Sequence, residues 1–279
     1  MSEPELNPLP PSIGPGAPAD PRTDTADAPP RWRPPPPRPA EPGALEAPLR
    51  VIHADARLIV IDKPAGLLCV PGRGPEGADC LAQRVVARYP TALVVHRLDM
   101  ATSGLVLMAG DAAMQRWLGL AFERRRMHKR YEAVVAGLLQ ADAGEIDQPM
   151  VVDWPRRPLQ KICPVEGRPA LTRWRVLARD PVRGTTRVAL EPVTGRSHQL
   201  RLHMASIGHP ILGDELYAPD PWVEAAPRLL LHACHLRLPP LPPLPETPPS
   251  PPRPDTPPAE TGTGADTASG PVFDCPAPF

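Results

Sequence analysis

Proline is so unevenly distributed along this 279-residue chain that it divides the sequence into a core and two ends. Of the 46 prolines, 16 lie in residues 1–48 and 15 in residues 239–279, which leaves 15 for the 190 residues between them. The ends are also rich in Ala, Gly, Ser and Thr and poor in apolar anchors, so they cannot bury enough surface to offset chain entropy. The sequence therefore predicts one folded domain with mostly disordered, partly polyproline II ends, whose protein partners are unknown.

The charge also differs between core and ends, although the formal net charge of the whole chain is zero. The ends contain 12 acidic and 5 basic residues, and the core contains 19 acidic and 26 basic residues, a formal charge of +7. A basic core suits a polyanionic partner, but many domains without such a partner reach this value. Charge alone is therefore weak support for nucleic-acid binding.

The cysteines and the N-terminus indicate the compartment. Five cysteines (Cys69, Cys80, Cys163, Cys234 and Cys275) show no CxxC spacing, which fits a reducing compartment better than a disulfide framework or a zinc ribbon. The N-terminus lacks the basic and apolar regions of a secretory signal, and no run approaches the roughly 18 apolar residues of a membrane span. We expect a soluble, cytoplasmic protein with no membrane partner.

Hydrophobic patterning in the core predicts more strands than helices. Strands are expected over 49–55, 57–64, 129–139, 169–179, 185–193 and 228–238, and helices over 80–89, 111–126 and 197–208. Asp111 is the expected N-cap of the second helix, and Ser197 or Thr194 that of the third, which should end at Gly208. Because the strands mostly follow one another, the sheet should be mixed and largely antiparallel.

The stretch "HRLDMATSG" (96–104) places charges where a core is expected. It lies between two apolar, strand-like runs, 93–95 and 105–108, and carries Arg97 and Asp99 two residues apart. One interpretation is an ordinary polar loop; the other is a carboxylate held at the floor of a cleft for chemistry. From the spacing alone, the structural interpretation is favoured.

Two later stretches raise similar alternatives. In "HKRYEAVVAG", Tyr131 follows Lys129 at the start of a strand, and an edge-strand tyrosine beside exposed bases is the commoner explanation. In "TGRSHQLRLH", a turn enters a helix whose free N–H groups could meet an anion. Arg196 and Arg201 are five residues apart and point in different directions on a helix, so one could pair with a buried carboxylate while the other meets phosphate.

Histidines in the same region invite a metal-site interpretation. His198 and His203 lack the i, i+4 spacing of a zinc-binding helix, and no acidic residue stands at the HExxH position. His209 is the third histidine considered. A metal site is therefore disfavoured, and with it a metal-dependent nuclease or other hydrolase.

Four stretches occur in an order that chance does not readily supply: "LIVIDKPAGLLCVPG", "HRLDMATSGLVLMA", "KRYEAVVAG" and "TGRSHQLRLHMASIGHPILGDELY". Together with "DWPRRPLQKICPVEGRPALT" and "RLLLHACHLRL", they closely resemble the RluA family of pseudouridine synthases, from about residue 49 to residue 239. The nearest resemblance is to the dual-specificity type that modifies tRNA anticodon loops and large-subunit (23S) rRNA.

This resemblance implies an α+β, pseudouridine-synthase-like fold with a bent, mixed and mainly antiparallel sheet, flanking helices and a central RNA-binding cleft. The implied reaction breaks the N1–C1′ bond of a uridine, turns the base and joins C5 to C1′. Because no net redox change occurs, no cofactor and no metal are expected. The implied partner is RNA, in stem-loops of tRNA (the anticodon arm) or of 23S rRNA.

The resemblance also implies roles for individual residues. The family's catalytic Asp matches Asp99, which could add to the sugar carbon, add to the base, or assist glycal formation. Its arginine partner matches Arg201, which would hold the carboxylate in position. The active-site Tyr matches Tyr131, whose ring offers a stacking surface for the extruded uracil.

A second group is implied to contact RNA. Arg97 matches a motif arginine associated with the space left by the flipped base, where its guanidinium can stack on neighbouring bases. Lys129, Arg196 and His198 are expected to be RNA-binding or scaffold residues.

The resemblance fixes the expected domain boundaries as well. We expect a disordered extension over 1–48, the catalytic domain over 49–239, a disordered insertion over 240–270, and a final strand over 271–279 that returns to the core. The extension does not resemble the S4-type RNA-binding domain of some relatives, so target choice should come from the core, with Arg31, Arg33 and Arg38 as further candidate contacts. A non-catalytic RNA-binding or ribosome-assembly protein on the same fold is the alternative, and a binder would not need to keep Asp99, Tyr131 and Arg201.

Overall fold

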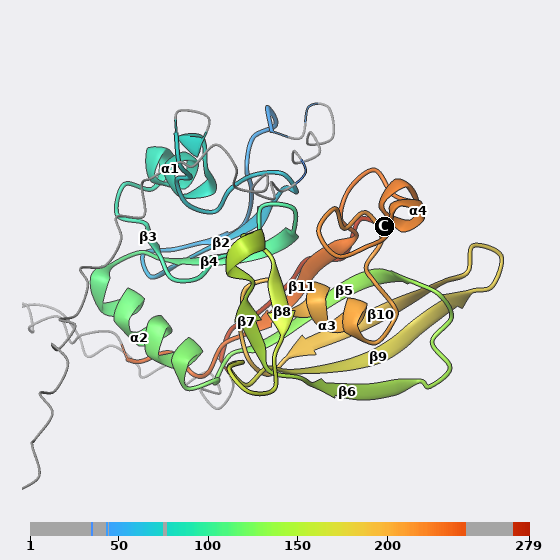
Figure 1. The fold of residues 1–279 in the computed structure, drawn as a ribbon. Coiled ribbons are helices and arrows are strands. Elements are labelled where there is room, and N and C mark those ends of the chain that lie inside the picture. The colour runs from blue at the N-terminus through green and yellow to red at the C-terminus, as the bar shows by residue number, and fades with distance from the viewer. Residues whose placement is uncertain (1–34, 36–42, 44, 75–76, 244–269) are drawn as a thin grey trace, which may run out of the picture. The chain divides into compact units, whose positions relative to one another are not determined.

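The computed structural model describes residues 35, 43, 45–74, 77–243 and 270–279 (Figure 1). Most of the disordered extension expected over 1–48 and of the insertion expected over 240–270 falls outside the described residues. The helices in the described part are α1 (Leu81–Arg88), α2 (Ala112–Glu123), α3 (Gln199–Ser206) and α4 (Asp220–Glu224), with a 3-10 turn at Trp154–Arg156.

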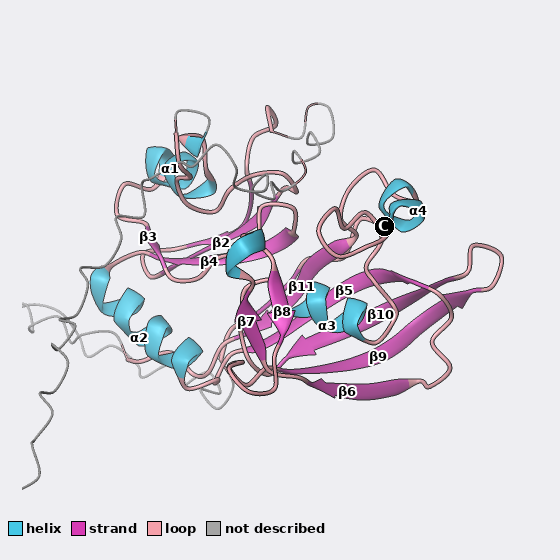
Figure 2. Ribbon diagram, viewed as in Figure 1, coloured by secondary structure: helices cyan, strands magenta, loops and turns pink. Residues whose placement is uncertain are grey.

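Strands predominate among the described residues, as Figure 2 shows, and ten of them form one sheet. Its path runs β1 (Arg50–Ala54), β2 (Leu58–Lys63), β4 (Ser103–Ala109), β11 (Leu231–Arg237), β5 (His128–Ala136), β10 (Thr185–Pro192), β9 (Leu171–Asp180) and β6 (Ala143–Asp147). Beside this path, β3 (Leu93–Val94) pairs with β4, and β12 (Val272–Asp274) pairs with β11. A separate hairpin joins β7 (Met150–Val152) and β8 (Gln160–Ile162).

All pairings in the ten-stranded sheet are antiparallel except that of β11 with β4. The predicted α+β class with a mixed, mainly antiparallel sheet is therefore confirmed. The parallel contact is short and joins His232 and Ala233 to Ser103 and Gly104. A Cβ on Gly104 would lie 2.4 Å from the Ala233 carbonyl oxygen, and its φ of +108° is unfavourable for other residues. The glycine of "TSG" thus permits the close approach that joins the two halves of the sheet.

Both faces of β2 and β4 are buried, which explains why these strands are almost continuously apolar. On one face, Leu58 and Leu107 pack with Leu118 of α2. On the other face, Ile59 and Met108 belong to the cluster that contains α1. In Figure 1, α1 and α2 accordingly lie on opposite sides of these strands.

The other half of the sheet is covered by α3. Leu200 and Met204 of α3 are buried against Val135 of β5 and Leu190 of β10. Since α3 begins directly beside the "TGRSHQ" turn, this packing fixes the turn relative to the central strands.

The helix predictions are confirmed with one correction. Asp111 caps α2, and its carboxylate accepts a hydrogen bond from the Met114 N–H at 2.8 Å. The N-cap of α3 is His198 and not Ser197 or Thr194. The Thr194 hydroxyl instead donates to Gln199 Oε1 at 2.7 Å, so the threonine holds the turn before the helix.

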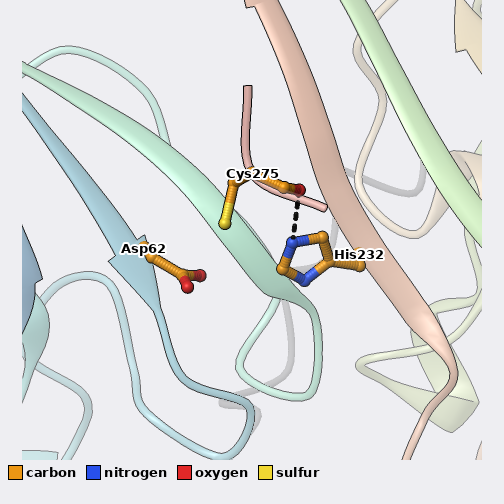
Figure 3. Close-up of side chains that lie close together, drawn as sticks. All are labelled: Asp62, His232 and Cys275. Atoms are coloured by element: carbon orange, nitrogen blue, oxygen red, sulfur yellow. Dashed lines mark hydrogen bonds between the residues drawn. The ribbon is translucent and has the colours of Figure 1, made fainter. Parts of the chain in front are cut away.

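The last described residues lie against the centre of the sheet. β12 pairs with the end of β11, and the Cys275 N–H donates to the Cys234 carbonyl at 2.8 Å. Figure 3 shows the Cys275 carbonyl accepting a hydrogen bond from His232, with Asp62 facing the Cys275 thiol. Among the described helices, none has the length and apolar character needed to cross a membrane.

Candidate active site

Three of the sequence motifs meet at one cavity of about 560 Å³. Its walls come from the loop between β3 and β4, from the first half of β5, and from the turn that leads from β10 into α3. Asp99, Lys129, Tyr131, Arg196, His198 and Arg201 all line it, together with Arg97. All seven residues predicted from the sequence are thus brought together, although they span more than a hundred positions of the chain.

Asp99 lies in the irregular segment between β3 and β4, where the Thr102 N–H donates to its carbonyl at 3.1 Å. Its side chain is 27% exposed, so the carboxylate is open to the cavity. Asp99 Oδ2 lies 3.6 Å from Arg201 Nη1, and Oδ1 lies 4.0 Å from His198 Nε2. The Arg201 guanidinium and the His198 imidazole therefore lie against the Asp99 carboxylate on the side away from the open cavity.

Arg201 is itself held by a second carboxylate. Its Nε and Nη2 donate to Asp214 at 2.8 and 2.6 Å, and both side chains are almost fully buried. Burial opposes the charged form of Arg201, but the Asp214 carboxylate more than offsets it, so the pKa of Arg201 is raised. Because two of its nitrogens are fixed by Asp214, Nη1 is left to face Asp99.

Asp214 was not singled out from the sequence. It follows the "GHPILG" segment, and its Oδ1 also accepts from the N–H groups of Leu216 and Tyr217 at 3.0 and 3.2 Å. The only signal was its position within the quoted "GDELY" stretch, because its contact with Arg201 is created by the tertiary fold.

Tyr131 lies in the middle of β5, paired with β10 on one side and β11 on the other. Lys129 and Tyr131 are two residues apart on one strand, so both side chains lie on the same face, towards the cavity. Burial, followed by the negative charge of Asp99, raises the pKa of Tyr131 above its usual value. At neutral pH the side chain is therefore a neutral phenol next to the carboxylate.

His198 is one of two non-glycine residues with a left-handed backbone in the described part of the chain (φ 56°). Its Nδ1 lies 2.8 Å from the hydroxyl of Tyr217, which accepts a hydrogen bond from the Gln160 N–H at 2.9 Å. With the hydroxyl as donor to Nδ1, the ring proton of His198 lies on Nε2, the nitrogen that is 4.0 Å from Asp99 Oδ1.

This arrangement makes His198 part of the support beneath the cavity. Its side chain is only 12% exposed, and burial lowers its pKa, so the ring is neutral at neutral pH. The Arg201 guanidinium lies 5.3 Å from the centre of the Tyr217 ring, which packs the two residues together. Tyr217 was also missed in the sequence, for the same reason as Asp214.

Lys63 of the "IDKPAG" stretch is a third residue that the sequence did not single out. It is fully buried, and its Nζ donates to the carbonyls of Pro64, Leu67 and Met100 at 2.8, 2.9 and 3.0 Å. Burial lowers its pKa to about 8, an effect that the negative charge of Asp99 partly offsets. Lys63 therefore fixes the loop after β2 to the residue that follows Asp99.

The lining of the cavity is basic. Among its lining residues, five are Arg or Lys (Arg97, Arg125, Lys129, Arg196 and Arg201) and two are acidic (Asp99 and Glu123). Arg97 is exposed and forms no ion pair with any described residue, whereas Arg196 Nε donates to the Pro169 carbonyl at 3.1 Å. Burial lowers the pKa of Lys129. A rim with this charge suits phosphate groups.

The histidines considered for a metal site serve separate structural contacts. His203 bonds to the Thr172 hydroxyl at 2.9 Å, and His209 bonds to the Ala136 carbonyl at 2.7 Å, while His198 bonds to Tyr217. Three histidines with different partners do not form a common ligand set.

One cluster of possible metal ligands does occur in the described part of the chain: Asp62, His232 and Cys275 (Figure 3). Both ring nitrogens of His232 are occupied, by the Ser103 hydroxyl at 2.9 Å and the Cys275 carbonyl at 3.0 Å. Burial, and secondarily Asp62, raises the pKa of the Cys275 thiol to about 12. These residues fit a structural contact better than a metal site.

Comparison with known proteins identifies the family. The sequence model of the RNA pseudouridylate synthase family matches residues 57–206. The dual-specificity RNA pseudouridine synthase RluA of Pasteurella multocida is 51% identical over 185 residues, which cover 66% of this chain and 84% of the relative. The protein of the same name from Vibrio cholerae is 51% identical over 186 residues, or 67% of this chain and 75% of the relative.

Solved structures agree with the sequence matches. The structure of human RNA pseudouridylate synthase domain containing 1 matches with a TM-score of 0.59 and 30% identity, over 71% of this chain and 81% of that chain. Human RNA pseudouridylate synthase domain containing 4 matches with a TM-score of 0.56 and 25% identity, over 68% and 84%. The chain therefore belongs to the RNA pseudouridylate synthase family and is an isomerase that acts on RNA.

Proposed function

We propose that this pseudouridine synthase modifies uridines in stem-loops of tRNA, at the anticodon arm, and of 23S rRNA, in the cytoplasm. The relatives at about half identity are named dual-specificity RNA pseudouridine synthases, which supports action on two kinds of RNA. Target recognition then comes from the domain over 49–239. No cofactor or metal takes part in the proposed reaction.

Asp99 is the proposed catalytic residue. The reaction breaks the N1–C1′ bond, forms the C5–C1′ bond, and moves a proton from C5 to N1, so atoms and electrons balance without an external reactant. The observation that carries the assignment is the Asp99 carboxylate, open to the cavity yet 3.6 Å from a buried guanidinium. Arg201 would keep the carboxylate in one orientation through nucleophilic addition or through sugar deprotonation, and both routes need that orientation.

Tyr131 and Arg97 have complementary proposed roles. A flipped uracil that enters the cavity can stack on the Tyr131 ring, which lies beside Asp99. The neutral hydroxyl of Tyr131 is available for proton transfer at C5 of the uracil. Arg97 is exposed on the same loop as Asp99 and can occupy the space that the base leaves in the RNA. Lys129 and Arg196 would contact phosphates at the rim.

Single-turnover assays with an anticodon stem-loop and an rRNA hairpin test this function. We expect Asp99→Asn to bind both RNAs like the wild type while the rate of pseudouridine formation falls by at least about a thousandfold. Product formation by the variant at near wild-type rate would overturn the assignment of Asp99. If the wild type binds both RNAs but modifies neither, the proposed targets are wrong.

A further inference from the structure

The β7–β8 hairpin carries an aromatic side chain that the cavity does not use. Trp154, in the 3-10 turn between the two strands, is 68% exposed. It is the only Phe, Tyr or Trp that is exposed among the residues described by the structure. Tryptophan is highly buried on average, so an indole with this exposure is unusual, and what surrounds it decides what it could bind.

A cation already lies on this ring. The Arg157 guanidinium is 4.6 Å from the centre of the Trp154 ring, and both side chains remain exposed. Lys161 is a second exposed positive charge on the same hairpin, whereas Arg156 is paired with Asp153. An exposed aromatic ring with a cation beside it is the composition used to stack nucleobases and hold the adjoining phosphates.

The hairpin holds Trp154 in a fixed place. Asp153 is buried, its N–H donates to the Leu159 carbonyl at 2.9 Å, and its carboxylate accepts from Arg156 Nε at 2.7 Å. Two prolines, Pro155 and Pro158, restrict the backbone of the turn. A preformed turn loses little conformational entropy when a ligand binds, which favours its use as a binding surface.

The same hairpin is connected to the catalytic carboxylate. The Gln160 N–H of β8 donates to the Tyr217 hydroxyl at 2.9 Å, and that hydroxyl bonds to His198, whose Nε2 is 4.0 Å from Asp99. In Figure 1 the hairpin lies beside α3, and β8 contacts α3. Through these bonds the position of Trp154 is fixed relative to the cavity.

We propose that Trp154 is a second nucleobase site, at which an unpaired base of the RNA substrate stacks outside the cavity that receives the target uridine. Arg157 would neutralise a phosphate next to that base. This inference rests on the proposed action on RNA stem-loops, but it concerns binding of the substrate and not the chemistry at Asp99.

The test measures binding of the anticodon stem-loop by fluorescence anisotropy, in an Asp99→Asn background that prevents turnover. We expect Trp154→Ala to weaken binding by about five- to a hundredfold, as the loss of one stacked base predicts. Trp154→Phe should recover most of the affinity. Val182→Ala is the control, because Val182 is 97% exposed on the β9–β10 turn.

Two further measurements separate stacking from other causes. The slope of log Kd against log salt should be unchanged in Trp154→Ala and smaller by about one in Arg157→Ala. Melting temperatures should match the wild type, since Trp154 is exposed. Binding by Trp154→Ala as tight as that of Val182→Ala would overturn the inference.

The two proposals fail in different ways. If the wild type binds RNA but makes no pseudouridine, the target assignment fails while the stacking site can still be measured. If the wild type makes pseudouridine and Trp154→Ala loses nothing in binding, only the stacking site fails. A wild type that is dimeric in solution and a Trp154→Ala variant that is monomeric would assign the indole to a protein interface and also overturn the inference.

Discussion

The floor and the rim of the cavity contain the same kinds of side chain but use them differently. At the floor, Arg201 is buried, is bonded twice to Asp214, and faces Asp99. At the rim, Arg97 is exposed and forms no ion pair with any described residue. A cation fixed on three sides by protein can orient a reacting group, whereas an exposed cation is free to meet phosphate or bases.

The largest expected effect is at the floor. Replacing Arg201 by Met leaves the fully buried Asp214 carboxylate unpaired, which should lower the free energy of unfolding by about 3–5 kcal/mol. The rate of pseudouridine formation should also fall severely, because Asp99 loses its orienting partner. Urea unfolding and single-turnover kinetics measure the two effects.

A double variant separates these two consequences. In Arg201→Met/Asp214→Asn the unpaired charge is removed, while the Asn oxygen can still accept from the Leu216 and Tyr217 N–H groups. We expect most of the stability to return and the rate to stay low. If the rate of pseudouridine formation recovered together with the free energy of unfolding, Arg201 would have only a structural role. The floor of the cavity would then not differ from the rim in orienting Asp99.

How far the sequence could predict this contrast depends on the range of the interactions. Helices α1 and α2 and the long strands follow from apolar spacing and from a local cap such as Asp111. The strands β6, β7 and β8 are too short to show a clear hydrophobic period. In addition, β6 pairs with β9, which is distant in the sequence, and β7 pairs with β8 across a loop.

The same distinction holds for the site. Asp99, Tyr131 and Arg201 could be named because their motifs resemble a family, but spacing alone favoured ordinary structural roles. Asp214, Tyr217 and Lys63 act through contacts made only in the folded chain. His198 was expected to be an RNA-binding or scaffold residue, and its bond to Tyr217 and low exposure favour the second of these roles.

Acid should lower the stability of the folded chain through His96, which lines the cavity. His96 Nε2 accepts from the Leu107 N–H at 2.9 Å, and burial, with a smaller contribution from Lys129, lowers the pKa of His96 from 6.5 to about 3. Between pH 6.5 and pH 3, His96 is therefore protonated in the unfolded chain and neutral in the folded chain. Stability should fall as the pH drops from 6.5 towards 3, with about 3 kcal/mol lost by pH 4 from this group.

The comparison that isolates His96 is the variant His96→Gln, whose amide oxygen can accept from Leu107 but does not titrate. Other buried histidines, among them His203 and His232, also have lowered pKa values and add to the acid sensitivity of both proteins. The difference in unfolding free energy between wild type and variant should therefore change between pH 7 and pH 4. A constant difference would contradict the assignment.

At the rim a smaller effect on binding is expected, with none on stability. Arg196→Ala should weaken binding of the stem-loop several-fold and reduce the salt slope by about one, with an unchanged melting temperature. Arg183→Ala removes the same charge from an 83% exposed side chain on the β9–β10 turn and serves as the control. Equal losses in the two variants would indicate a general charge effect and not a contact at the rim.

The smallest expected effect is a change in the free energy of unfolding at Thr102, which lies between the floor and the rim of the cavity. This residue is 2% exposed, lines the cavity next to Asp99, and its hydroxyl has no hydrogen-bond partner among the described residues. A buried, unpaired hydroxyl costs about 1–3 kcal/mol, so Thr102→Val, which keeps the shape, should raise the free energy of unfolding by about 1 kcal/mol. If Thr102 belongs with the structural floor, the rate of pseudouridine formation is unchanged in this variant. A gain in stability together with a loss of rate would instead show that the hydroxyl finds its partner when RNA is bound, and would add Thr102 to the proposed catalytic residues.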